Sequence, residues 1–398
     1  MTLNELENTV RKYYLLSDPY IIRLICSFVI SSRLPIKPPW LFLVAGSSGG
    51  KSSLLQSLAT CEGIIARDDF TVASFFTGMK GQEGIVQKMM NNFLLVVKDL
   101  SMMMSKDEKV RAELLGILRQ LYDGSYEKSY GNGVQIDWKG KMTLLAGTTT
   151  AIYPLLYQFS MLGERYLLYN FMQPDREEAT YKALEKDSMA DGVAEKEMQE
   201  AFKSFIDSVP IPKELPEEDP SVTKAIVKLS ELVSRGRSKV DRDHRDPKKG
   251  ITHIHDLEMP MRFAKQIKAV TYGLMVMSGE KILSDDEKKL VYKLALDSMP
   301  IMRKIVLRKL MQYTTVTTVD MAESLQLPTQ SIHIPLHDLS VLGVVRRYRI
   351  KENRDEWELL PKYRETLEKY EGIKSVEEVA EENEAEKDLY AEAEDVFS

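Results

Sequence analysis

Apolar residues recur along this chain in two patterns, helical spacing and continuous runs, which together predict an α/β protein. Residues 3–34 follow the three- and four-residue spacing of helices, with a stop and restart at 16–19. Helical spacing returns at 52–61 and 109–123. Continuous apolar runs are instead typical of buried parallel strands. Such runs occupy residues 41–45, 92–97, 142–147 and 161–169.

Alternation of apolar and polar residues marks a different element between residues 126 and 138. The alternation is centred on Tyr130, Gly131, Asn132 and Gly133. Asn-Gly is a strong signal for the tight turn of a β-hairpin. The sequence therefore predicts an exposed hairpin directly before the strand at 142–147.

The last part of the chain predicts a separate small unit. Helical spacing from 288 to 313 is followed by a short amphipathic helix at 314–325 and a second helix at 330–339. Two strands at 344–350 and 356–360, joined by a charged turn, complete the unit. Two short helices followed by a two-stranded wing resemble a winged helix-turn-helix.

Composition narrows the class of protein and its compartment. The chain has 398 residues and a formal net charge of -6, and eleven acidic residues lie between 371 and 398 against two lysines. The first 370 residues are therefore weakly basic, and the acidic tail is either a solvated end or a polyanion that competes with DNA for basic surfaces.

The two cysteines indicate the compartment. Cys26 and Cys61 give no disulfide framework, which suits the cytoplasm. The apolar segment at 20–30 contains Arg23 and is too short to span a bilayer, and the N-terminus lacks a signal-peptide pattern, so we expect no membrane association.

A glycine-rich turn follows the first apolar run and carries the clearest chemistry. It matches the phosphate-loop pattern at Gly50, Lys51 and Ser52, with Ala45 where the strict pattern has glycine. Backbone N–H groups of such a loop converge on a triphosphate at a helix N-terminus, where Lys51 neutralises the β/γ oxygens and Ser52 holds magnesium. We expect ATP and Mg2+ as cofactors, the alternative being a flexible Gly/Ser loop. The expected cradle comprises Ala45, Gly46, Ser47, Ser48, Gly49, Gly50, Lys51, Ser52 and Ser53.

A carboxylate ends the second apolar run. Ligands of parallel sheets bind outside the carboxyl ends of the strands, where Asp99 can reach a magnesium ion or orient water. Most hydrolytic P-loop ATPases place Asp-Glu directly after this run, whereas here Lys98 precedes Asp99 and no glutamate follows. Asp99 is therefore either the magnesium-associated acid or the water-activating group. Because the Asp-Glu pair is missing, a nucleotide sensor that does not hydrolyse ATP is a further alternative.

The order of these features resembles the core of the AAA+ ATPases: phosphate loop, acid-terminated strand, hairpin, polar-ended strand, and an arginine before the last strand. It is similar to the hairpin-bearing helicase clade, which includes the minichromosome maintenance helicases, and to replication ATPases of phages and mobile elements. The resemblance implies that Thr148 is the polar sensor and that Arg165 is a finger that reaches the ATP of a neighbouring subunit. It also implies that Arg262, which follows Pro260 at a helix start, is the lid sensor of the γ-phosphate.

Both arginines have plainer alternatives. Arg165 can form a structural ion pair with Glu164 or Asp175, and Arg262 can face solvent. The charged run at 234–246 is expected to be a solvated loop rather than a DNA site.

The hairpin and the wing are the candidate contacts with DNA, because cations track phosphate and aromatic rings stack on bases. The candidate residues are Lys128, Tyr130 and Lys139 in the hairpin and Arg346, Arg347 and Arg349 in the wing. The helix at 330–339 carries no arginine, which favours contact with the DNA backbone over base reading. A module that binds protein is the alternative for the wing, and ordinary exposed residues are the alternative for the hairpin.

These features predict an AAA+ P-loop ATPase core with a helical lid, followed by a winged helix-turn-helix. The expected boundaries are 1–175 for the core, 176–284 for the linker and lid, 285–370 for the winged module and 371–398 for the acidic tail. The expected function is that of an ATP-dependent DNA motor, a helicase or translocase. We expect it to act as a homo-oligomeric ring, and we expect that ring to be a hexamer. An AAA+ initiator, loader or defence ATPase that remodels a partner is the alternative. Because no separate DNA-binding domain precedes the core, loading onto DNA is expected to depend on a loader or initiator protein.

Overall fold

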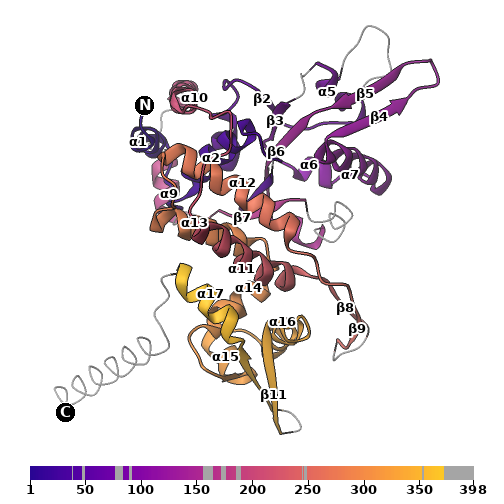
Figure 1. Ribbon diagram of the computed structural model, residues 1–398, viewed down its shortest axis with the longest axis vertical. Coiled ribbons are helices and arrows are strands. Elements are labelled where there is room, and N and C mark those ends of the chain that lie inside the picture. Colours follow the sequence, from indigo (N-terminus) through magenta and orange to yellow (C-terminus); the bar gives the residue numbers. More distant parts are fainter. Residues whose placement is uncertain are drawn as a thin grey trace, which may run out of the picture. The chain divides into compact units, whose positions relative to one another are not determined.

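The protein folds as two compact units (Figure 1). The first unit contains residues 1–223 and 262–294, and the second contains residues 224–261 and the described residues from 295 onward. The structure is a computed structural model, which describes residues 1–37, 39–46, 50–76, 84–88, 92–155, 165–171, 176–184, 190–243, 245, 249–351 and 354–371.

A five-stranded parallel sheet forms the centre of the first unit. Its strands are β1 (Trp40–Val44), β2 (Ile64–Arg67), β3 (Asn92–Val97), β6 (Lys141–Thr148) and β7 (Leu167–Asn170). They lie in the order β2-β3-β6-β1-β7, and every neighbouring pair is parallel. All five residues of β1 are buried, as the continuous apolar run predicts for a strand covered on both faces.

The strand predicted at 161–169 begins later than expected. Arg165 and Tyr166 precede β7, which starts at Leu167. Leu167 pairs with Leu41, and β1 itself begins only one residue before Leu41, so β1 offers no longer edge for pairing. Residues 161–164 lie outside the described part of the chain.

Helices surround this sheet. In chain order they are α1 (Leu3–Tyr13), α2 (Ile21–Arg33), α3 (Lys51–Gln56), α4 (Val72–Phe75), α5 (Ile85–Lys88), α6 (Ser101–Met104), α7 (Glu108–Asp123), the 3-10 helix η1 (Thr150–Leu155), α9 (Arg176–Leu184), α10 (Ala190–Ser208), α12 (Met261–Ser278) and most of α13 (Asp285–Asp297). The predicted interruption after residue 16 is confirmed, because α1 and α2 are separate helices.

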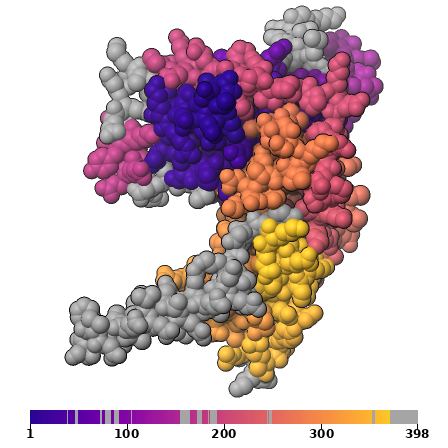
Figure 2. All heavy atoms as spheres, turned by 60° about the vertical axis from the view of Figure 1, so that its left-hand side comes forward, coloured from indigo at the N-terminus to yellow at the C-terminus, as the bar shows by residue number. Residues whose placement is uncertain are grey.

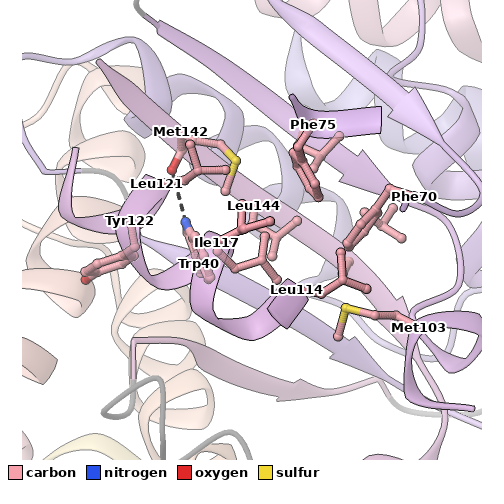
Figure 3. Close-up of a cluster of buried hydrophobic side chains, with 14 of the residues drawn as sticks. Trp40, Phe70, Phe75, Met103, Leu114, Ile117, Leu121, Tyr122, Met142 and Leu144 are labelled. Carbon is pink, nitrogen blue, oxygen red and sulfur yellow. Dashed lines mark hydrogen bonds between the residues drawn. The ribbon is translucent and has the colours of Figure 1, made fainter. Parts of the chain in front are cut away.

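Helix α7 supplies much of the core on one face of the sheet (Figure 3). Its residues Leu114, Ile117 and Leu121 recur at helical spacing and are all buried. They pack with Trp40 at the start of β1, whose indole Nε1 donates to the carbonyl of Met142 at 3.0 Å. Burial of such large side chains contributes about 2 kcal/mol each, so α7 is fixed firmly against the sheet.

Helices α2 and α12 meet at a glycine. A Cβ atom on Gly273 would lie 2.1 Å from the carbonyl oxygen of Ser27, so only glycine permits this approach. Helix α10 packs against both α1 and α2. Figure 2 shows the two N-terminal helices, in indigo, lying against these later parts of the chain.

The predicted hairpin is confirmed. Strands β4 (Ser125–Ser129) and β5 (Gln135–Lys139) pair in antiparallel register, and Gly133 in the turn has φ 81°. On β4, the Tyr126 ring stacks on Phe76 with centroids 3.8 Å apart. The hairpin is therefore anchored to the core of the first unit.

The second unit contains most of α11 (Pro220–Arg237) and a three-stranded antiparallel sheet. The sheet has the order β10-β12-β11. Its elements, with the helices beside them, are α14 (Ile301–Leu310), β10 (Val316–Thr317), α15 (Thr318–Leu325), α16 (Thr329–Val341), β11 (Val345–Lys351), β12 (Arg354–Leu359) and α17 (Pro361–Glu371). The two predicted short helices and the two predicted strands are confirmed.

The helical spacing predicted at 288–313 is present as two helices, because Pro300 cannot continue α13 and instead caps α14. One expectation for this region is wrong. The charged run at 234–246 is not a solvated loop: α11 ends at Arg237, and β8 (Val240–Arg242) pairs with β9 (Ile251–Ile254). Arg237 and Arg242 are held in ion pairs with Glu258 and Asp338, each at 2.5 Å.

Among the described residues, no helix is both long enough and apolar enough to cross a membrane.

Candidate functional site

The phosphate-loop residues lie at the carboxyl end of β1, where α3 begins. Gly50 caps α3 with φ 76°, a left-handed conformation that favours glycine. Lys51 is the first residue of α3, and its ammonium donates to the carbonyls of Ala45 at 2.9 Å and Gly46 at 2.7 Å. Burial lowers the pKa of Lys51, and the nearby Asp99 carboxylate opposes that shift. The lysine is thus held over the cradle, where a phosphate oxygen would be a stronger acceptor than either carbonyl.

Ser52 and Ser53 occupy the next two positions of α3. Their place in the first turn puts their hydroxyls beside the N-terminus of the helix, as the phosphate-loop pattern requires. Ser47, Ser48 and Gly49 lie outside the described residues.

Thr148 and Asp99 lie at the same edge of the sheet as Lys51. Thr148 ends β6 and pairs with Val44 of β1, and its carbonyl accepts from the N–H of Ala45 at 3.2 Å. Asp99 follows β3, the strand on the far side of β6, and its Oδ1 accepts from the N–H of Ser101 at 2.8 Å. The fold therefore brings one lysine, one hydroxyl and one carboxylate together at the carboxyl edge, a set suited to a phosphate and a magnesium ion.

Lys98, the residue that breaks the usual acidic pair, is directed away from the cradle. Its ammonium lies 2.5 Å from Asp68, at the end of the outer strand β2. The ion pair explains how a lysine is accommodated next to Asp99 without neutralising that carboxylate.

Gly147 is a site residue that sequence reasoning missed. A Cβ atom there would lie 2.5 Å from the carbonyl oxygen of Lys98, and the N–H of Leu100 donates to the Gly147 carbonyl at 2.7 Å. The segment that carries Asp99 therefore crosses directly over the end of β6. A glycine inside an apolar strand often marks such a close approach, and this was the available signal.

Gly147→Ala is expected to displace residues 98–100 and with them Asp99. We predict that magnesium-dependent hydrolysis falls about tenfold or more, because a misplacement of 1 Å at a reacting group costs up to two orders of magnitude. Gly116→Ala is the matched control, since a Cβ there meets nothing within 4 Å and alanine favours the interior of α7. Equal hydrolysis rates for the two variants would contradict this role of Gly147.

Arg165 lies at the opposite, amino-terminal edge of the sheet. It precedes β7, is 6% exposed, and forms a bidentate pair with Asp123 at the end of α7, with N to O distances of 2.9 and 3.2 Å. The ion pair expected as the alternative is thus present, but with Asp123; Glu164 and Asp175 lie outside the described residues. Because β1 runs from this edge to the cradle, Arg165 cannot reach the phosphates that its own Lys51 would bind.

Arg262 lies with Arg165 rather than with Lys51. It is exposed at the start of α12. Burial lowers the pKa of Lys37, Asp123 acts in the opposite direction, and the charges of Arg165 and Arg262 lower it further. The Lys37 ammonium is 3.6 Å from Asp123. Lys37 and Arg165 therefore both pair with Asp123, and Arg262 is near enough to act on Lys37, at the edge of the sheet that is remote from the cradle.

Two of the candidate DNA-contacting residues of the hairpin make contacts within the protein. Tyr130 packs partly buried against the core of the first unit, and its hydroxyl lies 3.4 Å from the carbonyl of Phe76. Lys128 lies 3.7 Å from Glu113 and over the Tyr130 ring. Lys139 is exposed.

The wing arginines fall into two groups. Arg346 and Arg349 are mostly exposed, although Arg346 also pairs with Glu358 at 3.2 Å. Arg347 is directed inward, where it pairs with Asp355 at 2.6 Å and lies over the Trp357 ring. Of these three arginines, Arg346 and Arg349 are therefore accessible from solvent, whereas Arg347 is held in a buried contact.

No family model matches the chain, and no curated protein matches it. Among solved structures, a "putative ATPase" from Cytophaga hutchinsonii is similar, with 15% identity and a TM-score of 0.43 over 84% of this chain and 93% of that one. The class is accordingly defined by this chain's own geometry: an α/β protein with a five-stranded parallel sheet and a phosphate-loop sequence at the carboxyl end of β1.

Proposed function

We propose that this protein binds ATP with magnesium at the phosphate loop and hydrolyses it at an interface between two copies of the chain. The observation that carries the proposal is the division of the candidate residues between two edges of one sheet. Lys51, Asp99 and Thr148 lie at the carboxyl edge, whereas Arg165 and Arg262 lie at the amino edge. A cation that neutralises the developing charge accelerates phosphoryl transfer, and in this proposal a neighbouring copy supplies it, because this chain's own Arg165 and Arg262 lie at the other edge.

In this proposal each residue has a defined role. The loop N–H groups and Lys51 bind the phosphates, Ser52 and Asp99 hold the magnesium ion, and Thr148 positions the attacking water near the γ-phosphate. Magnesium would neutralise charge on the β and γ oxygens. Arg165, released from Asp123, stabilises the transition state in the neighbouring site, and Arg262 contacts the same nucleotide.

We further propose that the protein is an AAA+ ATPase of the hairpin-bearing helicase clade and acts on DNA as a ring, with residues 285–370 as a winged helix-turn-helix. The support is the anchored hairpin between α7 and β6, together with the exposed Arg346 and Arg349 on the wing. An initiator, loader or defence ATPase is favoured by one observation, the partial burial of Tyr130, which leaves less of its ring for stacking on a base.

DNA-stimulated ATP hydrolysis distinguishes these functions. We expect single-stranded or forked DNA to raise the hydrolysis rate, and Arg346→Ala with Arg349→Ala to weaken DNA binding and lower the salt dependence by about two phosphate contacts while basal hydrolysis is unchanged. Lys362→Ala with Lys369→Ala removes two exposed charges from α17 of the same unit and serves as the control. Hydrolysis without any response to DNA would favour the partner-remodelling ATPase, and absence of strand displacement on a fork would exclude the helicase.

A further inference from the structure

Helix α13 brings a lysine to the edge of the sheet that holds the phosphate loop. The Lys293 ammonium donates to the carbonyl of Asn170 at 2.6 Å. Asn170 ends β7 and pairs with Val44, the last residue of β1, and the next N–H, that of Phe171, donates to the Val44 carbonyl at 2.8 Å. The Phe171 N–H faces β1, so the Asn170 carbonyl of the same peptide group, and Lys293 with it, lies on the outer side of β7. Strand β7 itself lies one strand spacing, roughly 5 Å, from β1 and the start of the cradle.

The position of Lys293 is fixed by a buried aromatic platform. Its ammonium lies over the Tyr169 ring, 3.9 Å from the centroid. Tyr169 is fully buried, and its hydroxyl donates to Asp18 at 2.7 Å. Asp18 is itself 1% exposed and also accepts from the N–H of Tyr20 at 3.0 Å. A cation held over such a ring is pre-organised, because neither the ring nor the carboxylate behind it can turn away.

Lys293 lies on the β7 side of β1, and this side indicates which part of a nucleotide the lysine would contact. Asp99 follows β3 and Thr148 ends β6, both on one side of β1, and in the proposed function they mark the side of the γ-phosphate and magnesium. Strand β7 lies on the other side of β1. A nucleotide whose terminal phosphate points towards β6 must extend its α-phosphate and ribose towards β7. Segment 14–18 borders that region as well, because the Tyr14 ring lies 3.6 Å from the Cβ position of Gly50.

Asn170 connects this flank to the polar end of β6. Its side-chain oxygen accepts from the hydroxyl of Tyr153, which belongs to η1 and follows Thr148 by five residues. One residue thus contacts the phosphate-loop strand through its backbone, η1 through its side chain, and α13 through Lys293.

We propose that Lys293 is a nucleotide-binding residue that contacts the α-phosphate and ribose end of the ligand, the part that ATP and ADP share. This inference rests on the proposed function. On binding, the ammonium exchanges the neutral Asn170 carbonyl for an anionic phosphate oxygen, and such a charge-assisted hydrogen bond is roughly twice as strong as a neutral one. Helix α13 thereby contacts the bound nucleotide whether it is ATP or ADP. Lys51, Thr148 and the arginines of a neighbouring copy distinguish ATP from ADP, because they contact the γ-phosphate.

Nucleotide titration of Lys293→Met tests this assignment. We expect the Kd values for ATP and for ADP to rise together by about tenfold or more, with their ratio unchanged, because a charged hydrogen bond to a shared group is lost. The KM for ATP should rise in parallel, while kcat at saturating ATP stays within about twofold of wild type, since no transition-state contact is removed. Lys289→Met, at an exposed position one turn earlier on α13, is the matched control and should bind like wild type.

Two further results would overturn the assignment. If Lys293→Met binds both nucleotides like Lys289→Met, Lys293 does not contact the ligand, and if only ATP binding weakens, Lys293 reads the γ-phosphate instead. Lys293→Gln keeps a donor for the Asn170 carbonyl but removes the charge, so it should show the same loss even if the methionine variant folds poorly. If the wild-type protein binds neither nucleotide, the proposed function fails with the inference; wild-type binding with no effect at Lys293 overturns the inference alone.

Discussion

Arg165→Ala is expected to lower kcat for ATP hydrolysis by about a thousandfold or more. An arginine that neutralises charge on the transferred phosphoryl group supplies this order of rate enhancement. Arg165 lies at the edge of the sheet remote from Lys51, so the loss would be felt in the site of a neighbouring copy. Nucleotide binding to the altered chain itself should remain, since its own cradle is intact. Single-turnover hydrolysis with magnesium measures the loss.

Asp123→Asn distinguishes this role from a structural ion pair. The substitution weakens the bidentate pair at 2.9 and 3.2 Å but leaves the arginine in place. If Arg165 acts on a neighbour's ATP, Asp123→Asn keeps hydrolysis or increases it, because less energy is needed to release the guanidinium. If the pair only holds the fold together, both variants should lose stability and activity to the same extent.

Asp338→Asn is expected to destabilise the second unit by about 3–5 kcal/mol, the usual result of removing one member of a buried ionic cluster. The carboxylate on α16 accepts from Arg303 of α14 at 2.9 Å and from Arg242 of β8 at 2.5 Å. Arg303 also donates to the carbonyls of Gly236 and Ser238, so one cluster joins α11, β8, α14 and α16. Burial lowers the pKa of Arg303, and the Asp338 charge opposes that shift. A neutral amide would leave two guanidinium groups buried without a counter-charge.

Denaturant-dependent hydrogen exchange of the α16 amides measures this effect. Glu323→Gln removes an exposed carboxylate of α15 and is the control, with an expected change below about 0.5 kcal/mol. Replacing all three members, by Asp338→Leu, Arg242→Met and Arg303→Met, should recover most of the stability, because apolar substitutes of similar volume are often neutral. Equal protection of α16 in Asp338→Asn and in Glu323→Gln would contradict the account.

The order of helices and strands could be predicted because it depends on local spacing. The break between α1 and α2, the hairpin around Gly133 and the elements from α15 to β12 all follow from periodicity and turn residues. The phosphate loop was equally accessible, since its chemistry is carried by consecutive residues. The helical spacing at 288–313 does not by itself show the division into α13 and α14, which Pro300 imposes.

The remaining site residues depend on contacts between distant segments, and these leave little local signal. Asp123 ends a helix and looks like an ordinary exposed carboxylate until Arg165 is brought beside it, 42 residues later. Asn170 and Lys293 are separated by 123 residues and acquire a role only through the packing of α13 against β7. The charged run at 234–246 was misread for the same reason, because the partner of Arg242 is 96 residues away on α16.

Mixing Lys51→Ala chains with Arg165→Ala chains tests most directly the claim that ATP is hydrolysed between copies. The first variant lacks the cradle lysine but keeps its arginine, and the second keeps a complete cradle but lacks the arginine. The account predicts that neither variant hydrolyses ATP alone, and that the mixture does so with magnesium, because an intact cradle then meets an intact Arg165 across some interfaces. A mixture as inactive as its components, from variants that each still fold and assemble, would contradict it.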